Sequence, residues 1–156
     1  MAMERTFAML KPDAVQRGLV GEIIRRLEAT GLRLVGLRMM WASRSQAEAQ
    51  YGEEIARKYG EQVREWLLNY TCEGPVVPML LEGPNAIASV RALAGDRPSP
   101  CDCTPGTIRR DLGSDSQELS ATEGRAIRNL IHTADSLESA EREAGIWFGS
   151  LYPDAE

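Results

Sequence analysis

The sequence predicts an α+β fold of the ferredoxin-like type, a βαββαβ sandwich with helices packed on a mostly antiparallel four-stranded sheet. Short apolar runs typical of buried strands alternate along the chain with stretches whose apolar residues recur at helical spacing. This alternation fits two βαβ units, although several doubly wound folds would produce a similar order. No internal repeat and no linker between two cores is visible, so we expect residues 1–156 to form a single domain.

The first predicted unit starts with a buried strand at Thr6–Leu10. Pro12 ends this strand and biases Lys11 towards an extended backbone. A lysine at the end of a strand is either solvated or a phosphate ligand, and its position alone favours the solvated case. A helix is predicted over Glu22–Thr30, where a stripe of apolar side chains recurs at helical spacing. The members of this stripe are Val20, Ile23, Ile24 and Leu27.

The middle of the chain reads as one strand followed by two helices. Leu32–Trp41 alternates loosely between apolar and polar residues, which fits a strand. Gln46–Lys58 is predicted as one polar helix and Glu61–Tyr70 as a further short helix. Tyr51 and Tyr59 lie eight residues apart across the first helix. Tyrosines in this arrangement more often pack at the edge of a core than stack on a ligand.

The next unit is again a strand and a helix, and a long irregular segment follows. Val76–Leu81 reads as an apolar strand, in which Pro78 predicts an edge position or a bulge. Asn85–Ala94 has the spacing of a helix, with Arg91 beside its apolar face. Gly95–Gly113 shows little periodicity, which predicts an ordered loop or a binding loop.

The last unit leads into the segment that contains His132. Ser114–Thr122 is polar and is expected to be exposed. Arg128–Ile131 reads as a short strand that runs into His132, and Asp135 with Glu138 has the spacing of a capping box at a helix start. We therefore expect His132 at a strand end that faces a helix N-terminus. Such a place suits an anion, because unpaired backbone N–H groups point at it.

His132 is the only histidine of the protein. One interpretation is a partly buried histidine with local hydrogen bonds, which is the more common case for a lone histidine. The other is a nucleophile or general base, since histidine can be neutral at physiological pH. Spacing along the chain does not decide between the two.

Composition excludes several classes of protein. The formal net charge is −5, so the chain lacks the basic surface expected of a nucleic-acid-binding protein. No apolar run is long enough for a membrane span, and the N-terminus lacks the apolar core of a signal peptide. The cysteines are Cys72, Cys101 and Cys103; the last two are too close for a usual zinc pair, and no second pair exists. We therefore expect reduced thiols in a cytoplasmic protein.

Four blocks of the chain resemble the nucleoside diphosphate kinase family, in the family's order. They are ERTFAMLKPDAVQRGLVGEII at Glu4–Ile24, GPVV at Gly74–Val77, PGTIR at Pro105–Arg109, and NLIH at Asn129–His132 followed by Asp135, Ser136 and Glu143. This resemblance implies a ferredoxin-like fold and a homo-oligomer. It also implies a ping-pong transfer of the γ-phosphoryl group from a nucleoside triphosphate to a nucleoside diphosphate. Mg²⁺ would be carried by the nucleotide phosphates rather than by a metal site of the protein.

The resemblance also implies roles for particular residues. It makes His132 the nucleophile that becomes phosphohistidine, and it places Glu143 against the imidazole to orient the ring. Lys11 is implied in catalysis as well as in nucleotide binding. The full set of implied nucleotide-binding residues is Lys11, Tyr51, Tyr59, Arg91, Arg97, Arg109 and Asn129.

The chain departs from the family pattern in three places. The usual His-Gly-Ser-Asp-Ser is here His132-Thr133-Ala134-Asp135-Ser136, so the serine hydroxyl two residues after the histidine is missing. The threonine usual in the loop after the helix aligns near Arg97. Stretches near Gly60–Asn69 and Ser114–Arg125 are longer than usual. The intact implied site favours an enzyme over the alternative, a catalytically silent nucleotide-binding scaffold of the same fold. Base preference and oligomer size do not follow from the sequence.

Overall fold

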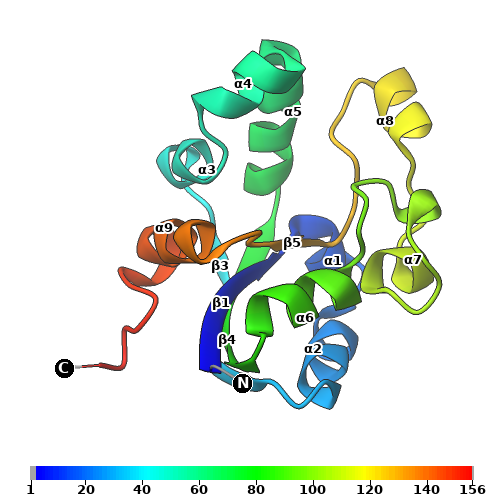
Figure 1. The fold of residues 1–156 in the computed structure, drawn as a ribbon. Coiled ribbons are helices and arrows are strands. Elements are labelled where there is room, and N and C mark those ends of the chain that lie inside the picture. Colours follow the sequence, from blue (N-terminus) through cyan, green and yellow to red (C-terminus); the bar gives the residue numbers. More distant parts are fainter. Residues whose placement is uncertain (1–2, 156) are drawn as a thin grey trace.

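The computed structural model describes residues 3–155 and shows an antiparallel sheet with helices packed on it, as predicted (Figure 1). The strands are β1 (Met3–Leu10), β2 (Arg33–Leu37), β3 (Met40–Trp41), β4 (Pro75–Pro84) and β5 (Ile131–Thr133). The helices are α1 (Pro12–Gln16), α2 (Val20–Ala29), α3 (Arg44–Gln50), α4 (Glu53–Tyr59), α5 (Glu61–Cys72), α6 (Ala86–Ala94), α7 (Ile108–Leu112), α8 (Gln117–Glu123), α9 (Leu137–Phe148) and the short 3₁₀ helix η1 (Pro100–Asp102).

The strands lie side by side in the order β2-β4-β1-β5, and every pair is antiparallel. β3 lies outside this path and pairs with the start of β4. The two central strands, β1 and β4, pair over their whole length, from Met3 opposite Pro84 to Leu10 opposite Val77. The short β5 joins the free edge of β1, which brings the chain around residue 132 next to the end of β1.

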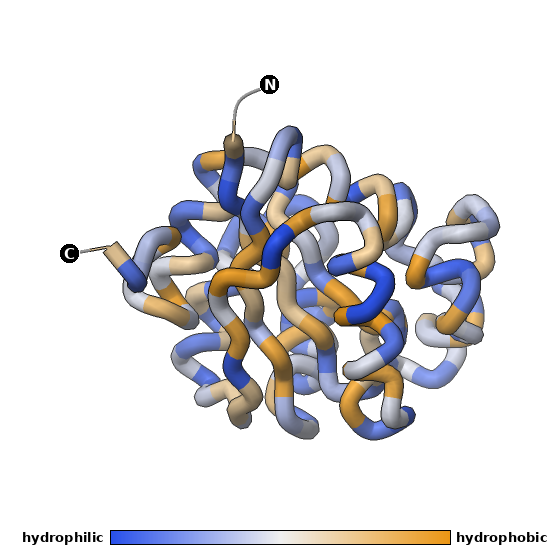
Figure 2. Tube along the Cα trace, turned by 90° about the horizontal axis from the view of Figure 1, so that it is seen from below, coloured by the Kyte–Doolittle hydropathy of each residue, from blue (hydrophilic) through white to orange (hydrophobic). Residues whose placement is uncertain are grey.

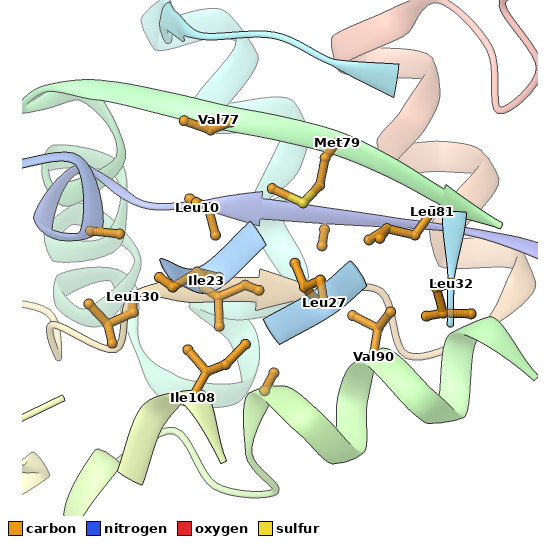
Figure 3. Packing of buried hydrophobic residues seen from close by; sticks show 14 of the residues in the cluster. Leu10, Ile23, Leu27, Leu32, Val77, Met79, Leu81, Val90, Ile108 and Leu130 are labelled. Atoms are coloured by element: carbon orange, nitrogen blue, oxygen red, sulfur yellow. The ribbon is translucent and has the colours of Figure 1, made fainter. Parts of the chain in front are cut away.

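Each face of the sheet carries its own hydrophobic cluster. Side chains alternate along β1, so Ala8 and Leu10 face α2 and α6 while Phe7 and Met9 face α9. Figure 3 shows the first cluster, in which side chains from β1 and β4 meet those from both helices. Figure 2 shows hydrophobic residues concentrated along the central strands. Because both faces of the central strands are covered, these strands read as nearly continuous apolar runs.

The predicted single helix over Gln46–Lys58 is wrong, because it is broken into α3 and α4 at Tyr51 and Gly52. Tyr51 leaves the helical conformation, with φ −118° and ψ 85°. The carbonyl groups that the break would leave without partners accept hydrogen bonds from two arginines. Arg64 Nε donates to the Tyr51 carbonyl at 2.8 Å, and Arg142 Nη1 donates to the Ala49 carbonyl at 2.8 Å.

Pro78 was predicted at an edge or a bulge of the sheet, whereas β4 is a central strand between β1 and β2. The strand predicted over Leu32–Trp41 is itself interrupted after Leu37, between β2 and β3. The Pro78 carbonyl accepts a hydrogen bond from the Arg38 backbone N–H at 3.1 Å, so this side of Pro78 faces the interruption. In a strand, the N and the carbonyl of one residue point to the same side. The Pro78 nitrogen therefore faces the gap between β2 and β3, where regular strand pairing has ended. Its missing N–H removes no hydrogen bond from the sheet.

Most of the segment Ser114–Thr122 is exposed, as predicted, although it includes the start of α8 and two of its residues are buried. Asp115 and Ser120 are 5% and 4% exposed. The Asp115 carboxylate accepts hydrogen bonds from Arg125 at 2.6 and 3.1 Å and from the Arg128 backbone N–H at 2.7 Å. The buried Asp115 carboxylate therefore ties the segment to the chain that connects α8 with β5.

Two smaller expectations are also corrected. The predicted loop over Gly95–Gly113 contains η1 and α7. The N-cap of α9 is Ser136, whose side chain accepts from the Ser139 backbone N–H, whereas Asp135 accepts from the Ser139 hydroxyl. Within residues 3–155, no helix has the length and apolar character needed to cross a membrane.

Candidate active site

His132 was expected at the end of a strand. It is instead the middle residue of β5. It lies opposite Met9 of β1, and Leu130 enters the strand with a φ of +73°. Ile131 and Thr133 are buried, so alternation directs the His132 side chain to the face that α9 covers. The imidazole lies 5.8 Å from the Tyr51 ring in an edge-on arrangement, and 21% of its surface is exposed.

Glu143 reaches the imidazole from the middle of α9. Its Oε1 lies 2.9 Å from His132 Nε2, and the residue is 3% exposed. Arg142 Nη2 lies 3.4 Å from the second carboxylate oxygen of Glu143. Within the described residues, no hydrogen bond of the ring engages Nδ1. When Nε2 donates its proton to this carboxylate, the Nδ1 lone pair is open to a reagent.

Two further side chains at the ring were missed by the sequence analysis. Gln50, the last residue of α3, places its Nε2 3.2 Å from His132 Nε2. The Trp147 indole donates to Gln50 Oε1 at 2.8 Å. Gln50 and Trp147 are 97 positions apart, so no local pattern could have paired them. Their position next to Tyr51 and on the apolar face of α9 was the only signal available.

Lys11 is buried at the end of β1, and the prediction from position alone, a solvated lysine, is wrong. Its Nζ donates to Asn129 Oδ1 at 2.8 Å and lies 5.9 Å and 5.2 Å from the ring centres of Tyr51 and Tyr70. Burial, assisted by the nearby charge of Arg109, lowers the pKa of Lys11 to about 7. Asn129 thus holds the ammonium group next to the strand that carries His132.

Tyr70 was also not foreseen. Its hydroxyl donates to Asp13, and the carboxylate of Asp13 acts on Lys11 in the direction that raises the lysine pKa. The Arg128 guanidinium carbon lies 4.6 Å from the same ring centre. The Tyr70 ring therefore contacts two cations and is held in place by a buried carboxylate.

Arg109 connects the loop after α6 with β5. Nη1 donates to the carbonyls of Gly95 and Arg97, both at 3.1 Å. Nη2 donates to the Ile131 carbonyl at 2.6 Å, and Nε to that of Asn129 at 3.3 Å. Burial lowers the pKa of Arg109. Its guanidinium thus brings a positive charge close to Lys11 while it fixes both segments.

The remaining predicted residues lie farther out. Arg91, on α6, is exposed and lines an opening of about 450 Å³ together with Glu4 and Asp135. Arg97 is exposed, and its carbonyl is held by Arg109. Tyr59 is the last residue of α4 and is 56% exposed. The structure thus brings Lys11, Tyr51, Arg109, Asn129, His132 and Glu143 together. Tyr59, Arg91 and Arg97 are exposed, and besides burial the charge of Arg91 contributes to the lowered pKa of Arg109.

The donors around His132 suit an anion better than a metal ion. Among the described residues, no group of three or more His, Cys, Asp or Glu side chains could hold a metal. Ammonium, guanidinium and amide groups converge instead, and these groups bind phosphate oxygens. An imidazole with one nitrogen held by a carboxylate and the other free, next to such cations, can attack a phosphoryl group.

Comparison with known proteins agrees with this chemistry. The family model "Nucleoside diphosphate kinase" matches residues 4–151. A nucleoside diphosphate kinase of Archaeoglobus fulgidus is 46% identical over 146 residues, which cover 94% of this chain and 87% of that protein. A Borrelia burgdorferi nucleoside-diphosphate kinase with bound vanadate and ADP, a transition-state mimic, superposes with a TM-score of 0.89 at 35% identity and covers 94% of this chain and 87% of that one. An NDP kinase from Pyrobaculum aerophilum gives 0.86 at 39% identity, covering 94% and 96%.

Proposed function

Because the chain belongs to the nucleoside diphosphate kinase family, we propose that His132 is the side chain through which this phosphotransferase moves a phosphoryl group between nucleotides. The observation that carries the proposal is the contact of 2.9 Å between His132 Nε2 and Glu143 Oε1. This contact fixes the ring and leaves Nδ1 unprotonated when Nε2 carries the proton. The vanadate bound in the Borrelia relative supports a site that accommodates a phosphoryl group in transfer.

In the first half of the reaction, Nδ1 attacks the γ-phosphorus of a nucleoside triphosphate. The Nδ1–P bond forms, the bridging P–O bond breaks, and its electron pair leaves with the nucleoside diphosphate. Positive charge develops on the ring, and the ionised Glu143 stabilises it across the Nε2 contact. The second half reverses these steps, because a different diphosphate takes the phosphoryl group from Nδ1.

An acidic protein that binds a polyanion needs its cations concentrated in one place. Lys11 and Arg109 provide this concentration beside His132, and Asn129 holds Lys11 there. We assign phosphate and sugar binding to this group together with Arg91 and Arg97 at the periphery. Tyr51 lies beside the lysine, and Tyr59 has the exposed ring that a base can stack on.

Mg²⁺ would enter on the nucleotide phosphates, because the side chains that converge here are cations and amides rather than carboxylates. When bound, it would neutralise part of the phosphate charge. We further propose that residues 1–156 act as one domain in a cytoplasmic homo-oligomer. Its interface would include the β2–β3 edge, where Leu37, Met39 and Trp41 are 50%, 58% and 64% exposed.

Steady-state exchange between ATP and GDP tests the proposal. The protein should form GTP, with parallel lines in double-reciprocal plots at several ATP concentrations, as a covalent intermediate requires. His132→Ala should form none. Intersecting lines would exclude the intermediate, and a folded wild-type protein that binds ADP yet makes no GTP would support the silent scaffold instead.

A further inference from the structure

Two side chains contact Nε2 of His132, and they require opposite hydrogen-bonding roles of this nitrogen. The ionised carboxylate of Glu143, at 2.9 Å, can only accept a hydrogen bond from this nitrogen. Gln50 Nε2 lies 3.2 Å from the same atom. One ring nitrogen cannot donate to the first group and accept from an amide N–H at the same time. The imidazole therefore has two hydrogen-bonded states at Nε2, one with a proton and one without.

The orientation of the Gln50 amide is set by Trp147. An indole N–H can only donate, and it lies 2.8 Å from Gln50 Oε1. The amide oxygen therefore faces the indole, and the NH₂ group faces the imidazole. Gln50 and Trp147 are 2% and 1% exposed. A buried amide held in this way presents a donor, and not an acceptor, to Nε2.

We infer that Gln50 is a positioning residue that stabilises the form of His132 in which Nε2 carries no proton, and thereby prolongs the lifetime of the phosphorylated ring. The second part rests on the proposed role of His132. In the free enzyme, this form is the tautomer with the proton on Nδ1, which cannot attack phosphorus. Glu143 stabilises the other tautomer, in which Nδ1 is free.

In the phosphorylated enzyme, Nε2 can pass its proton to the Glu143 oxygen that it contacts, and Gln50 then donates to the freed lone pair. The Nδ1–P bond stays intact, and breaking it in this state would release an imidazolate, which is a poor leaving group. Transfer requires the proton to return from Glu143 to Nε2. The Nδ1–P bond then breaks with its electron pair on nitrogen, and phosphorus bonds to an oxygen of a nucleoside diphosphate or of water. Gln50 therefore slows loss of the phosphoryl group to water while the enzyme awaits a nucleotide.

Gln50→Met tests this inference, because methionine is similar in length and has no N–H donor. His132 is the only histidine, so ¹⁵N spectra of the protein contain the signals of one imidazole ring. We expect the population of the Nδ1–H tautomer to fall about fivefold, the factor that corresponds to one neutral hydrogen bond. The half-life of the phosphoenzyme in nucleotide-free buffer should shorten by up to the same factor. Gln117→Met, at an exposed glutamine of α8, is the matched control and should change neither value.

Trp147→Phe provides a second test if Gln50→Met does not fold. It keeps an aromatic ring in the core and removes the indole donor, so the amide is free to turn its oxygen towards Nε2. Both readouts should move in the same direction as for Gln50→Met. Folded variants whose tautomer ratio and phosphoenzyme half-life stay within twofold of wild type would overturn the inference. If the wild type takes up no phosphoryl group, the proposed function fails instead, and the tautomer ratio alone decides the role of Gln50.

Discussion

Replacing Lys11 by methionine should make the protein more stable while it removes its activity. The lysine lies at the end of β1 and is 6% exposed, and burial lowers its pKa from 10.5 to about 7. Methionine has a similar length and no charge to bury. The free-energy cost of burying the ammonium group would then disappear, which stabilises the folded protein. The cation that we assign to binding the nucleotide phosphates would be lost as well.

The size of the effect follows from the pKa. At about 1.36 kcal/mol per pH unit, keeping the ammonium charged in the folded protein costs at most about 5 kcal/mol below pH 7. The substitution also leaves Asn129 Oδ1 without its donor, which costs about 1–3 kcal/mol. Lys11→Met should therefore raise the free energy of unfolding by about 2–4 kcal/mol at pH 6.

The pH dependence has a defined sign. Between pH 7 and 10.5, the unfolded chain holds more protons on Lys11 than the folded protein, so wild-type stability rises with pH. The advantage of the variant should therefore shrink by about 1.4 kcal/mol for each pH unit above 7. Urea unfolding, followed by tryptophan fluorescence at one protein concentration from pH 6 to 9, measures this difference. Lys58→Met, at the only other lysine, which is exposed, is the control. A difference in stability that stays constant over this range would show that the buried ammonium group of Lys11 is not its cause.

Three more predictions concern the periphery of the site. Tyr59→Ala should raise KM for all nucleotides by a similar factor, because stacking on a base contributes about 1–3 kcal/mol, and a rise for purines alone would contradict the assignment. Ala134→Ser should speed phosphorylation in rapid-quench experiments about 10- to 100-fold, since a hydrogen bond from the serine hydroxyl to the charged Glu143 contributes about 1.5–3 kcal/mol, and an unchanged rate would contradict such a bond. Asp115→Ala should lower the free energy of unfolding by about 3 kcal/mol, whereas Glu123→Ala, at the exposed partner of the same arginine, should change it by less than about 1 kcal/mol. Equal effects of the last two substitutions in urea unfolding would show that the burial of Asp115 is unimportant.

The strands were predictable because central strands covered on both faces read as continuous apolar runs, as at Thr6–Leu10. The break at Tyr51 was not predictable, since the arginines that take up the exposed carbonyls are 13 and 93 positions from their partners. The tolerance of Pro78 in a central strand depends likewise on where a neighbouring strand ends. Such features depend on tertiary contacts, which local sequence patterns do not reveal.

The candidate active site was likewise only partly predictable from local sequence patterns. Spacing alone left His132 undecided, and only the resemblance of four separate blocks pointed to a nucleophile. The structure places Glu143 at the ring, and the assignment of roles to both residues remains a prediction. Lys11 was judged solvated from its position at a strand end, because its burial depends on the rings of Tyr51 and Tyr70 from elsewhere in the chain. Gln50 carried no signal beyond its position next to Tyr51, since its partner Trp147 lies on another helix.

The intact mass of the purified protein after incubation with ATP and Mg²⁺ shows most directly whether His132 carries a phosphoryl group. The protein should gain one phosphoryl group that is labile in acid and stable in base, as a phosphohistidine is. GDP should then remove the group and appear as GTP, and His132→Ala should gain none. A folded wild-type protein that never gains the phosphoryl group, or a His132→Ala variant that still gains it, would show that His132 is not the phosphorylated nucleophile.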